Sequence, residues 1–238
     1  MNESLFEKKM TELTHGIKIP QFIRIHQNAE IRQLTNPCKQ LRDQITANPG
    51  YTTIKPNDRV AIAVGSRNIY RLADYINVIV ECIKNRGGIP YIIAAMGSHG
   101  GNTIDGQIEI LKHFGITQDN CGCEIYASTS TRQLEYDIWL NNLVFDADHL
   151  ILINRIHPHT SFRGDYESGL AKLLAVGLGN REGAYYLHSL GMDNMSMNIR
   201  NSAERIIKQI NIAFAIGIIE NSIGKTFCMS VISKEDIM

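Results

Sequence analysis

The sequence lacks the features that mark several classes of protein. It has no net charge, because 24 basic residues balance 24 acidic ones, and this argues against the basic surface that binds nucleic acid or anionic membranes. Its longest apolar runs, such as residues 89–96, are as long as a strand and too short to span a membrane. It contains no internal repeat and no low-complexity stretch. We therefore expect neither a nucleic acid nor a membrane as a partner.

The cysteines and the first residues also lead us to expect neither a disulfide framework nor a secretion signal. The five cysteines are odd in number and scattered, which does not fit a disulfide framework. Cys121 and Cys123 form one close pair, but without CxxC spacing, and two interpretations stay open: a metal or redox site, or two small residues where a loop enters a strand. Charged residues at positions 3, 7, 8 and 9 interrupt any apolar signal segment. We expect a cytoplasmic protein.

From Arg59 onward, short apolar runs alternate with helical patterns. This alternation predicts the α/β class, with a mostly parallel, Rossmann-like sheet between two helical layers. Residues 1–58 carry fewer signals, although the loose alternation of Gln21–His26 predicts an edge strand, and we expect them to form an N-terminal extension to an α/β domain at 59–238. The expected strands are 60–64, 89–95, 124–127, 149–154, 213–220 and 226–233, and the expected helices are 70–85, 103–114, 168–176 and 198–212.

Three polar loops follow three of the predicted strands. They are Gly65-Ser66-Arg67, Gly97-Ser98-His99-Gly100-Gly101 and Arg155-Ile156-His157-Pro158-His159. In an open α/β sheet, ligands bind beyond the carboxyl ends of the strands. The sequence therefore predicts that the three loops meet at one cleft.

Each of these loops allows more than one interpretation. His99 stands among glycines, which let a ligand approach the backbone closely, and its imidazole can transfer protons near neutral pH; it could instead cap the helix that follows. Arg67 could hold a carboxylate with two hydrogen bonds, or form an ordinary surface ion pair. His157 and His159 point in opposite directions in an extended segment, so we do not expect both to bind one metal.

Two further residues follow the third loop. Lys172 lies in an apolar stretch and could reach out to solvent along its aliphatic stem. A desolvated lysine would instead have a lowered pKa and act as a nucleophile. His188 is most simply interpreted as a core or capping histidine.

Several runs of residues together resemble a known family. The runs are Met96-Gly97-Ser98-His99-Gly100-Gly101-Asn102-Thr103, His157-Pro158-His159-Thr160, Ser168-Gly169-Leu170-Ala171-Lys172 and Gly177-Leu178-Gly179. In this order they resemble the N-terminal domain of the nickel-pincer-dependent lactate racemase family, in its branch with a GSHGG loop. The resemblance extends from about Arg59 to the C-terminus. Residues 59–238 would then be the cofactor-binding domain.

The resemblance implies a cofactor and residues that hold it. The cofactor is a nickel pincer, a pyridinium mononucleotide carrying soft donor atoms. Lys172 resembles the lysine that tethers it covalently, and His188 resembles the histidine that completes the nickel coordination. Their separation, 188 − 172 = 16, is the family's spacing. Ser66 lies in the loop expected to contact the cofactor.

The resemblance also implies an activity, the racemisation or epimerisation of a small 2-hydroxy acid. His99 and His159 resemble the acid–base pair on opposite faces of the substrate carbon, which gives hydride to the cofactor while a histidine takes the hydroxyl proton. Arg67 matches an arginine that holds the substrate. The alternative is a non-catalytic α/β module that binds a nucleotide or small anion, which would leave Lys172 and His188 without a role.

The sequence departs from the family pattern in two places. Val64 stands where the family has an aspartate, three residues before the arginine, and the stretch between His159 and Lys172 is slightly longer. In addition, the family continues into a C-terminal domain near the position of Met238. We expect full activity to require such a domain, either joined to this chain or supplied in trans.

Overall fold

The computed structural model describes residues 4–18, 20–29, 31–135 and 137–238. Its six-stranded sheet has the order β3-β2-β1-β6-β7-β8, and all strands are parallel except β8, which pairs antiparallel with β7. Without the separate β4–β5 hairpin, this is the order 3-2-1-4-5-6 of a Rossmann-like sheet. The predicted α/β class is confirmed. The strands are β1 (Arg59–Val64), β2 (Ile89–Ala94), β3 (Glu124–Tyr126), β4 (Thr131–Glu135), β5 (Ile138–Asn141), β6 (His149–Arg155), β7 (Ile212–Glu220) and β8 (Thr226–Ile232).

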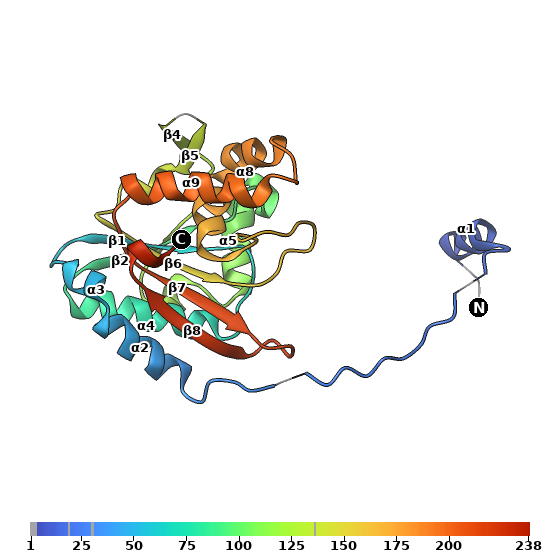
Figure 1. Ribbon diagram of the computed structural model, residues 1–238, viewed down its shortest axis with the longest axis horizontal. Coiled ribbons are helices and arrows are strands. Elements are labelled where there is room, and N and C mark those ends of the chain that lie inside the picture. Colours follow the sequence, from blue (N-terminus) through green and yellow to red (C-terminus); the bar gives the residue numbers. More distant parts are fainter. Residues whose placement is uncertain (1–3, 19, 30, 136) are drawn as a thin grey trace.

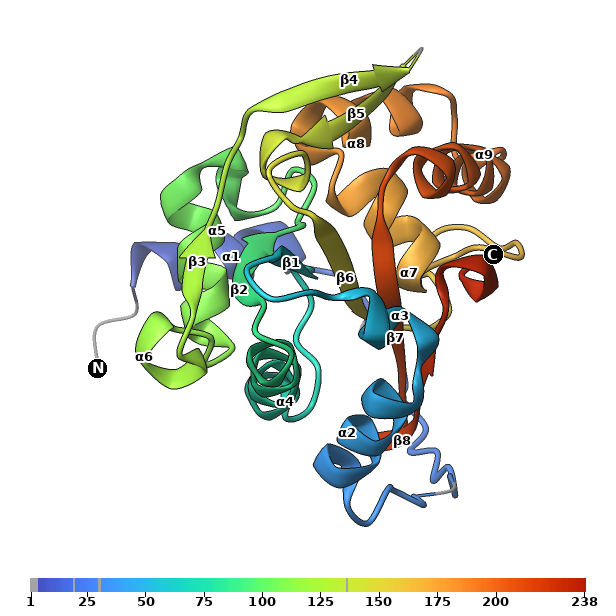
Figure 2. The same ribbon diagram turned by 90° about the vertical axis from the view of Figure 1, so that its left-hand side faces the viewer.

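Helices cover both faces of the sheet, as Figures 1 and 2 show. Helices α2, α4 and α5 enclose one hydrophobic core, and α7, α8 and α9 enclose the other with the β4–β5 hairpin. Burial on both faces explains why the central strands are continuous apolar runs rather than alternating ones; residues 60–64 are at most 1% exposed. The helices are α2 (Pro37–Ala47), α3 (Pro49–Thr53), α4 (Leu72–Asn85), α5 (Ile104–His113), α6 (Gln118–Cys121), α7 (Gly169–Lys172), α8 (Asn180–Ser189) and α9 (Met195–Gln209).

The helix predicted at 168–176 is two different structures. Helix α7 is a single turn that ends at Lys172, and residues Leu173–Gly177 form a wider π turn. The Leu178 amide donates to the Leu173 carbonyl at 2.8 Å, five residues back. The carbonyl of Gly177 in turn accepts the amide of Gly97 at 2.9 Å. Apolar spacing cannot reveal a π turn, because such turns depend on contacts with another segment.

The edge strand predicted at Gln21–His26 is wrong. This segment is exposed and pairs with no described strand. The free edge of β8 is occupied instead by Gln44 of α2: its amide nitrogen donates to the Met229 carbonyl at 3.2 Å, and its oxygen accepts the Val231 amide at 2.8 Å. One side chain thus satisfies backbone groups that a further strand would have paired, a way of protecting a sheet edge.

The N-terminal part of the chain contains one exposed helix and one helix that packs on the sheet domain. Helix α1 (Leu5–Thr14) begins with a capping box between Ser4 and Glu7, buries no residue, and lies away from the sheet in Figure 1. Helix α2, in contrast, packs on α4 and β8, and its Leu41 and Ile45 are fully buried. In the described parts of the chain, no helix is both long enough and apolar enough to cross a membrane.

Candidate active site

The three loops singled out in the sequence lie at the same edge of the sheet. Val64, the last residue of β1, is in register with Ala94 of β2 and with Ile153 of β6, so the parallel strands end level with one another. The connection after β1 covers one face and the connection after β6 covers the other. The gap between these two strands is therefore the topological switch point, where ligands bind in open α/β sheets.

The loop after β1 is buried at its base and open at its tip. A Cβ on Gly65 would lie 3.3 Å from Leu173 and 3.4 Å from the side-chain oxygen of Asn154, so the loop packs closely on the segment that follows Lys172. Ser66 is half-buried and Arg67 is exposed. Arg67 has no ion-pair partner among the described residues, which leaves its guanidinium available for an anion.

The GSHGG loop needs its glycines. Gly97, Gly100 and Gly101 have φ values of 57°, 70° and 63°, in the left-handed region that favours glycine. His99 is exposed and its Nδ1 lies 2.9 Å from the carbonyl oxygen of Met96. Because a carbonyl only accepts, Nδ1 must donate, and the neutral ring carries its lone pair on Nε2. The capping role is wrong: Thr103 caps α5 by accepting the Gly106 amide.

The loop after β6 holds His159 by several contacts. Its Nδ1 accepts the backbone amide of Ser161 at 3.1 Å, so the neutral ring carries its proton on Nε2, the reverse of His99. The ring packs on Phe162, with centroids 4.3 Å apart. Burial, followed by the charge of Lys172, lowers the pKa of His159. His157 is fixed separately through backbone hydrogen bonds to the Ser168 hydroxyl.

Lys172 is half-buried and lacks an acidic partner. Its Nζ donates to the carbonyl of Glu167 at 3.4 Å and lies 5.2 Å from the centroid of the Phe162 ring. Burial lowers the pKa of Lys172, and the nearby charge of Arg67 lowers it further. No acidic side chain among the described residues forms a salt bridge with this amine. It is therefore an amine that the fold biases toward its neutral, nucleophilic form.

His188 lies near the end of α8 and is exposed, so the interpretation as a core histidine is wrong. Its Nδ1 lies 2.5 Å from the Ala184 carbonyl, one turn earlier, and must donate to it. The Nε2 lone pair therefore points away from the helix backbone, and an imidazole oriented by such a hydrogen bond is a common metal ligand.

The structure brings these side chains into one neighbourhood. The charge of Arg67 acts on Lys172, and the charges of Lys172 and His188 act on His159. The GSHGG loop joins them through Gly97, whose Cβ position lies 3.6 Å from Ala184 of α8 and whose amide bonds to the π turn. The roles assigned to these residues remain predictions.

The sequence analysis missed Glu167 as a residue of this neighbourhood. Its carboxylate accepts the backbone amides of His159 at 2.6 Å and Gly164 at 3.1 Å. The available signal was an acidic residue in a glycine-containing loop between His159 and Lys172. Cys121 and Cys123, by contrast, are buried where α6 passes into β3, and no group of three or more potential metal ligands occurs among the described residues.

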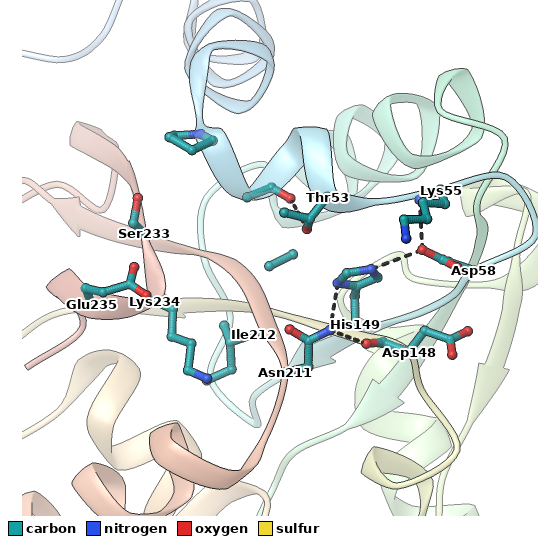
Figure 3. Close-up of a pocket in the computed structure, with 13 residues that line it drawn as sticks. Thr53, Lys55, Asp58, Asp148, His149, Asn211, Ile212, Ser233, Lys234 and Glu235 are labelled. Carbon is teal, nitrogen blue, oxygen red and sulfur yellow. Dashed lines mark hydrogen bonds and ion pairs between the residues drawn. The ribbon is translucent and has the colours of Figure 1, made fainter.

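A recess of about 880 Å³, drawn in Figure 3, is lined by residues at the beginnings of the strands, so it lies at the opposite edge of the sheet. At its base, His149 Nε2 lies 3.1 Å from Asp58, and its Nδ1 accepts the side-chain amide of Asn211 at 3.1 Å. Asn211 also donates to the carbonyl of Asp148. These contacts join the beginnings of β1, β6 and β7. None of the site residues predicted from the sequence lines this recess.

The fold and the carboxyl-edge loops define the class: a Rossmann-like α/β domain whose polar loops gather at the switch point of the sheet. Comparison with protein families is more specific, because the lactate racemase N-terminal domain family matches residues 14–199. The chain belongs to this family. The match begins earlier than the resemblance at Arg59 predicted, and it includes α2 and α3.

Comparison with solved structures agrees on the fold. The lactate racemase apoprotein from Thermoanaerobacterium thermosaccharolyticum is similar with a TM-score of 0.62 and 12% sequence identity, over 88% of this chain and 55% of that one. At this identity the likeness concerns the fold alone. The chain thus spans about half the length of that lactate racemase. No curated protein matches the sequence.

Proposed function

We propose that this chain is the cofactor-holding domain of a nickel-pincer-dependent racemase or epimerase of small 2-hydroxy acids. One observation carries the proposal: the half-buried amine of Lys172 has a lowered pKa and lies in one neighbourhood with Arg67, His159 and His188 at the switch point. A simple anion site would favour a charged lysine, whereas a covalent tether requires a neutral one.

The residues present fit such a cofactor. Lys172 would carry the covalent bond to the organic part, and His188, with its Nε2 lone pair free, would complete the nickel coordination. A pincer brings its own soft donor atoms, so one protein imidazole suffices for a tetragonal nickel site. Ser66, half-buried in the adjacent loop, would contact the organic part. When bound, the group would supply the acceptor for the hydride of the substrate carbon.

His99 and His159 would handle the hydroxyl proton. In their neutral forms His99 presents a lone pair on Nε2 and His159 presents a hydrogen on Nε2. His99 can therefore accept the hydroxyl proton on Nε2, while the Nε2 hydrogen of His159 can hold the substrate oxygen by a hydrogen bond. His159 would return a proton to the substrate only from its imidazolium form. The lowered pKa of His159 keeps its ring neutral near pH 7.

Arg67 would hold the substrate carboxylate. Its guanidinium is exposed in the loop after β1 and can form two parallel hydrogen bonds with a carboxylate. The charge that it places near Lys172 also lowers the pKa of that amine, after the larger effect of burial.

Closure over the substrate would come from a second domain, joined to this one or supplied in trans. Arg67, His99 and His188 are all exposed, and catalysis of this kind depends on excluding water and holding the reacting carbon near its acceptor. Adding a family C-terminal domain should raise racemisation by orders of magnitude.

The test is co-expression with the enzymes that make the pincer, followed by intact-mass and nickel analysis. We expect a covalent adduct on the wild-type chain and on Lys208→Ala, an exposed control in α9, and none on Lys172→Ala. His188→Ala should keep the adduct and lose nickel. An adduct that persists in Lys172→Ala would refute the proposal, and mononucleotide binding without any adduct would favour the non-catalytic module.

A further inference from the structure

Glu167 closes the loop that carries His159. Both oxygens of its carboxylate are used: Oε2 accepts the His159 amide at 2.6 Å, and Oε1 accepts the Gly164 amide at 3.1 Å. Its own backbone carbonyl accepts the amine of Lys172 at 3.4 Å. One residue is therefore bonded to the proposed proton-transfer histidine, to the far side of the loop and to the proposed tether.

We infer that Glu167 is a positioning residue for the proposed reaction: it fixes the backbone of His159 so that this ring presents its Nε2 hydrogen to the substrate, and it holds the Lys172 amine in the same arrangement. The inference rests on the proposed function for the roles of His159 and Lys172. Glu167 touches neither substrate nor cofactor in this scheme and acts through those two residues.

The geometry explains how a carboxylate can set the tautomer of a ring that it does not touch. The Ser161 amide must reach back two residues to the Nδ1 of His159, at 3.1 Å. That contact requires the tight turn that Glu167 closes by binding the amides of His159 and Gly164. Without the clamp, Nδ1 would meet water as readily as Nε2, and the neutral ring would populate both tautomers.

The charged groups around the loop agree with this role. Hydrogen bonds from the His159 and Gly164 amides lower the pKa of Glu167, so the clamp is a carboxylate at neutral pH. Arg163 is also close to Glu167, at 3.7 Å, and its guanidinium donates to the His159 carbonyl. The other titratable groups that act on His159 are Lys172, His157 and His188.

The loop that leads from His159 to α7 gives the clamp its purpose. A longer loop has more conformations to lose on ordering, so it needs additional contacts to keep one geometry. A bidentate carboxylate on two backbone amides is a strong way to provide them, because hydrogen bonds to a charged acceptor are stronger than neutral ones.

The experiment compares Glu167→Gln, Glu167→Asp and a neighbouring control, Ser168→Ala, on the full chain without cofactor. Ser168 holds His157 rather than His159. Hydrogen exchange of the His159 amide should accelerate about 10- to 100-fold in Glu167→Gln, and ¹⁵N shifts of the His159 ring should change from the Nε2–H form to a mixture. Glu167→Asp should partly restore both, and Ser168→Ala should change neither.

A purely structural role would lower stability and leave the ring tautomer unchanged, and that result would overturn the inference. In cofactor-loaded protein with its closing domain, Glu167→Gln should reduce kcat about 10²-fold, with KM little changed. Absence of any Lys172 adduct in the wild type would refute the proposed function instead, while the ring spectra would still decide the role of Glu167.

Discussion

Replacing Asn180 should test how α8, the helix that carries His188, is anchored. Asn180 is fully buried at the start of α8 and has a φ of 48°. Its amide nitrogen donates to the carbonyls of Ser128 at 2.9 Å and Ser130 at 3.4 Å, and its oxygen accepts the amide of Asn141 at 3.3 Å. The side chain thus joins α8 to the loop before β4 and to the end of β5.

The loss of unfolding free energy in Asn180→Ala follows from these contacts. The two shorter hydrogen bonds are worth about 1 kcal/mol each. The left-handed backbone conformation costs an alanine roughly 1–2 kcal/mol, because alanine lacks the polar side chain that offsets this cost in asparagine. The free energy of unfolding should therefore fall by about 3–4 kcal/mol. For a chain of this size, that corresponds to roughly 6–16 °C in Tm.

Asn180→Gly separates the two contributions. Glycine loses the same hydrogen bonds and adds about 0.4–1 kcal/mol of chain entropy in the unfolded state, but it avoids the left-handed penalty. It should be more stable than Asn180→Ala by about 0.5–1 kcal/mol in urea titrations followed by circular dichroism. If alanine is as stable as glycine, or if either loses less than about 1 kcal/mol, the account of this anchor is wrong.

Three further substitutions have outcomes set by the structure. Gln107 is fully buried and both amide atoms lack a partner among the described residues; Gln107→Met should raise the free energy of unfolding by about 1–3 kcal/mol, and a decrease in a urea titration would contradict this. Gln44→Ala should lower it by about 1–3 kcal/mol and expose the edge of β8; light scattering should detect aggregation that the wild type does not show. Lys172→Met should be more stable than the wild type at pH 7. The pKa of Lys172 in the folded protein lies below 10.5, its ordinary value. Between the folded and the unfolded pKa the unfolded state binds more protons, so wild-type stability rises with pH and the advantage of Lys172→Met should disappear as pH approaches 10.5. A stability difference that does not depend on pH would refute burial as the cause of the pKa shift.

Much of the fold could be predicted because buried parallel strands have a direct sequence signal. The runs at 60–64 and 89–95 are apolar throughout, and the run at 149–154 is apolar between His149 and Asn154. Each becomes a strand within one residue of the predicted bounds. The loops after them could be placed at one edge because parallel strands all end on the same side. The strand predicted at Gln21–His26 does not form, because alternation indicates a strand only where another strand is free to pair with it.

The site was predicted as a set of positions, and its internal arrangement was not predictable. The resemblance to the family singled out Lys172 and His188, but it could not show whether either side chain was buried. The burial of Lys172 depends on Phe162 and on the loop after β1, and the tautomers of His99 and His159 depend on single backbone groups. Such contacts arise only when the chain is folded.

The π turn after Lys172 has a consequence for how this site tolerates change. A π turn holds one residue more than an α turn, so the interval between Lys172 and His188 includes a residue that a regular helix would not need. Deleting one residue from Leu173–Gly177 would turn the π turn into an ordinary α turn and shift the backbone groups that follow it by one position. The Gly177 carbonyl would then leave the Gly97 amide. The spacing between Lys172 and His188 therefore also determines where the GSHGG loop is held, so a single deletion would displace all three relative to one another.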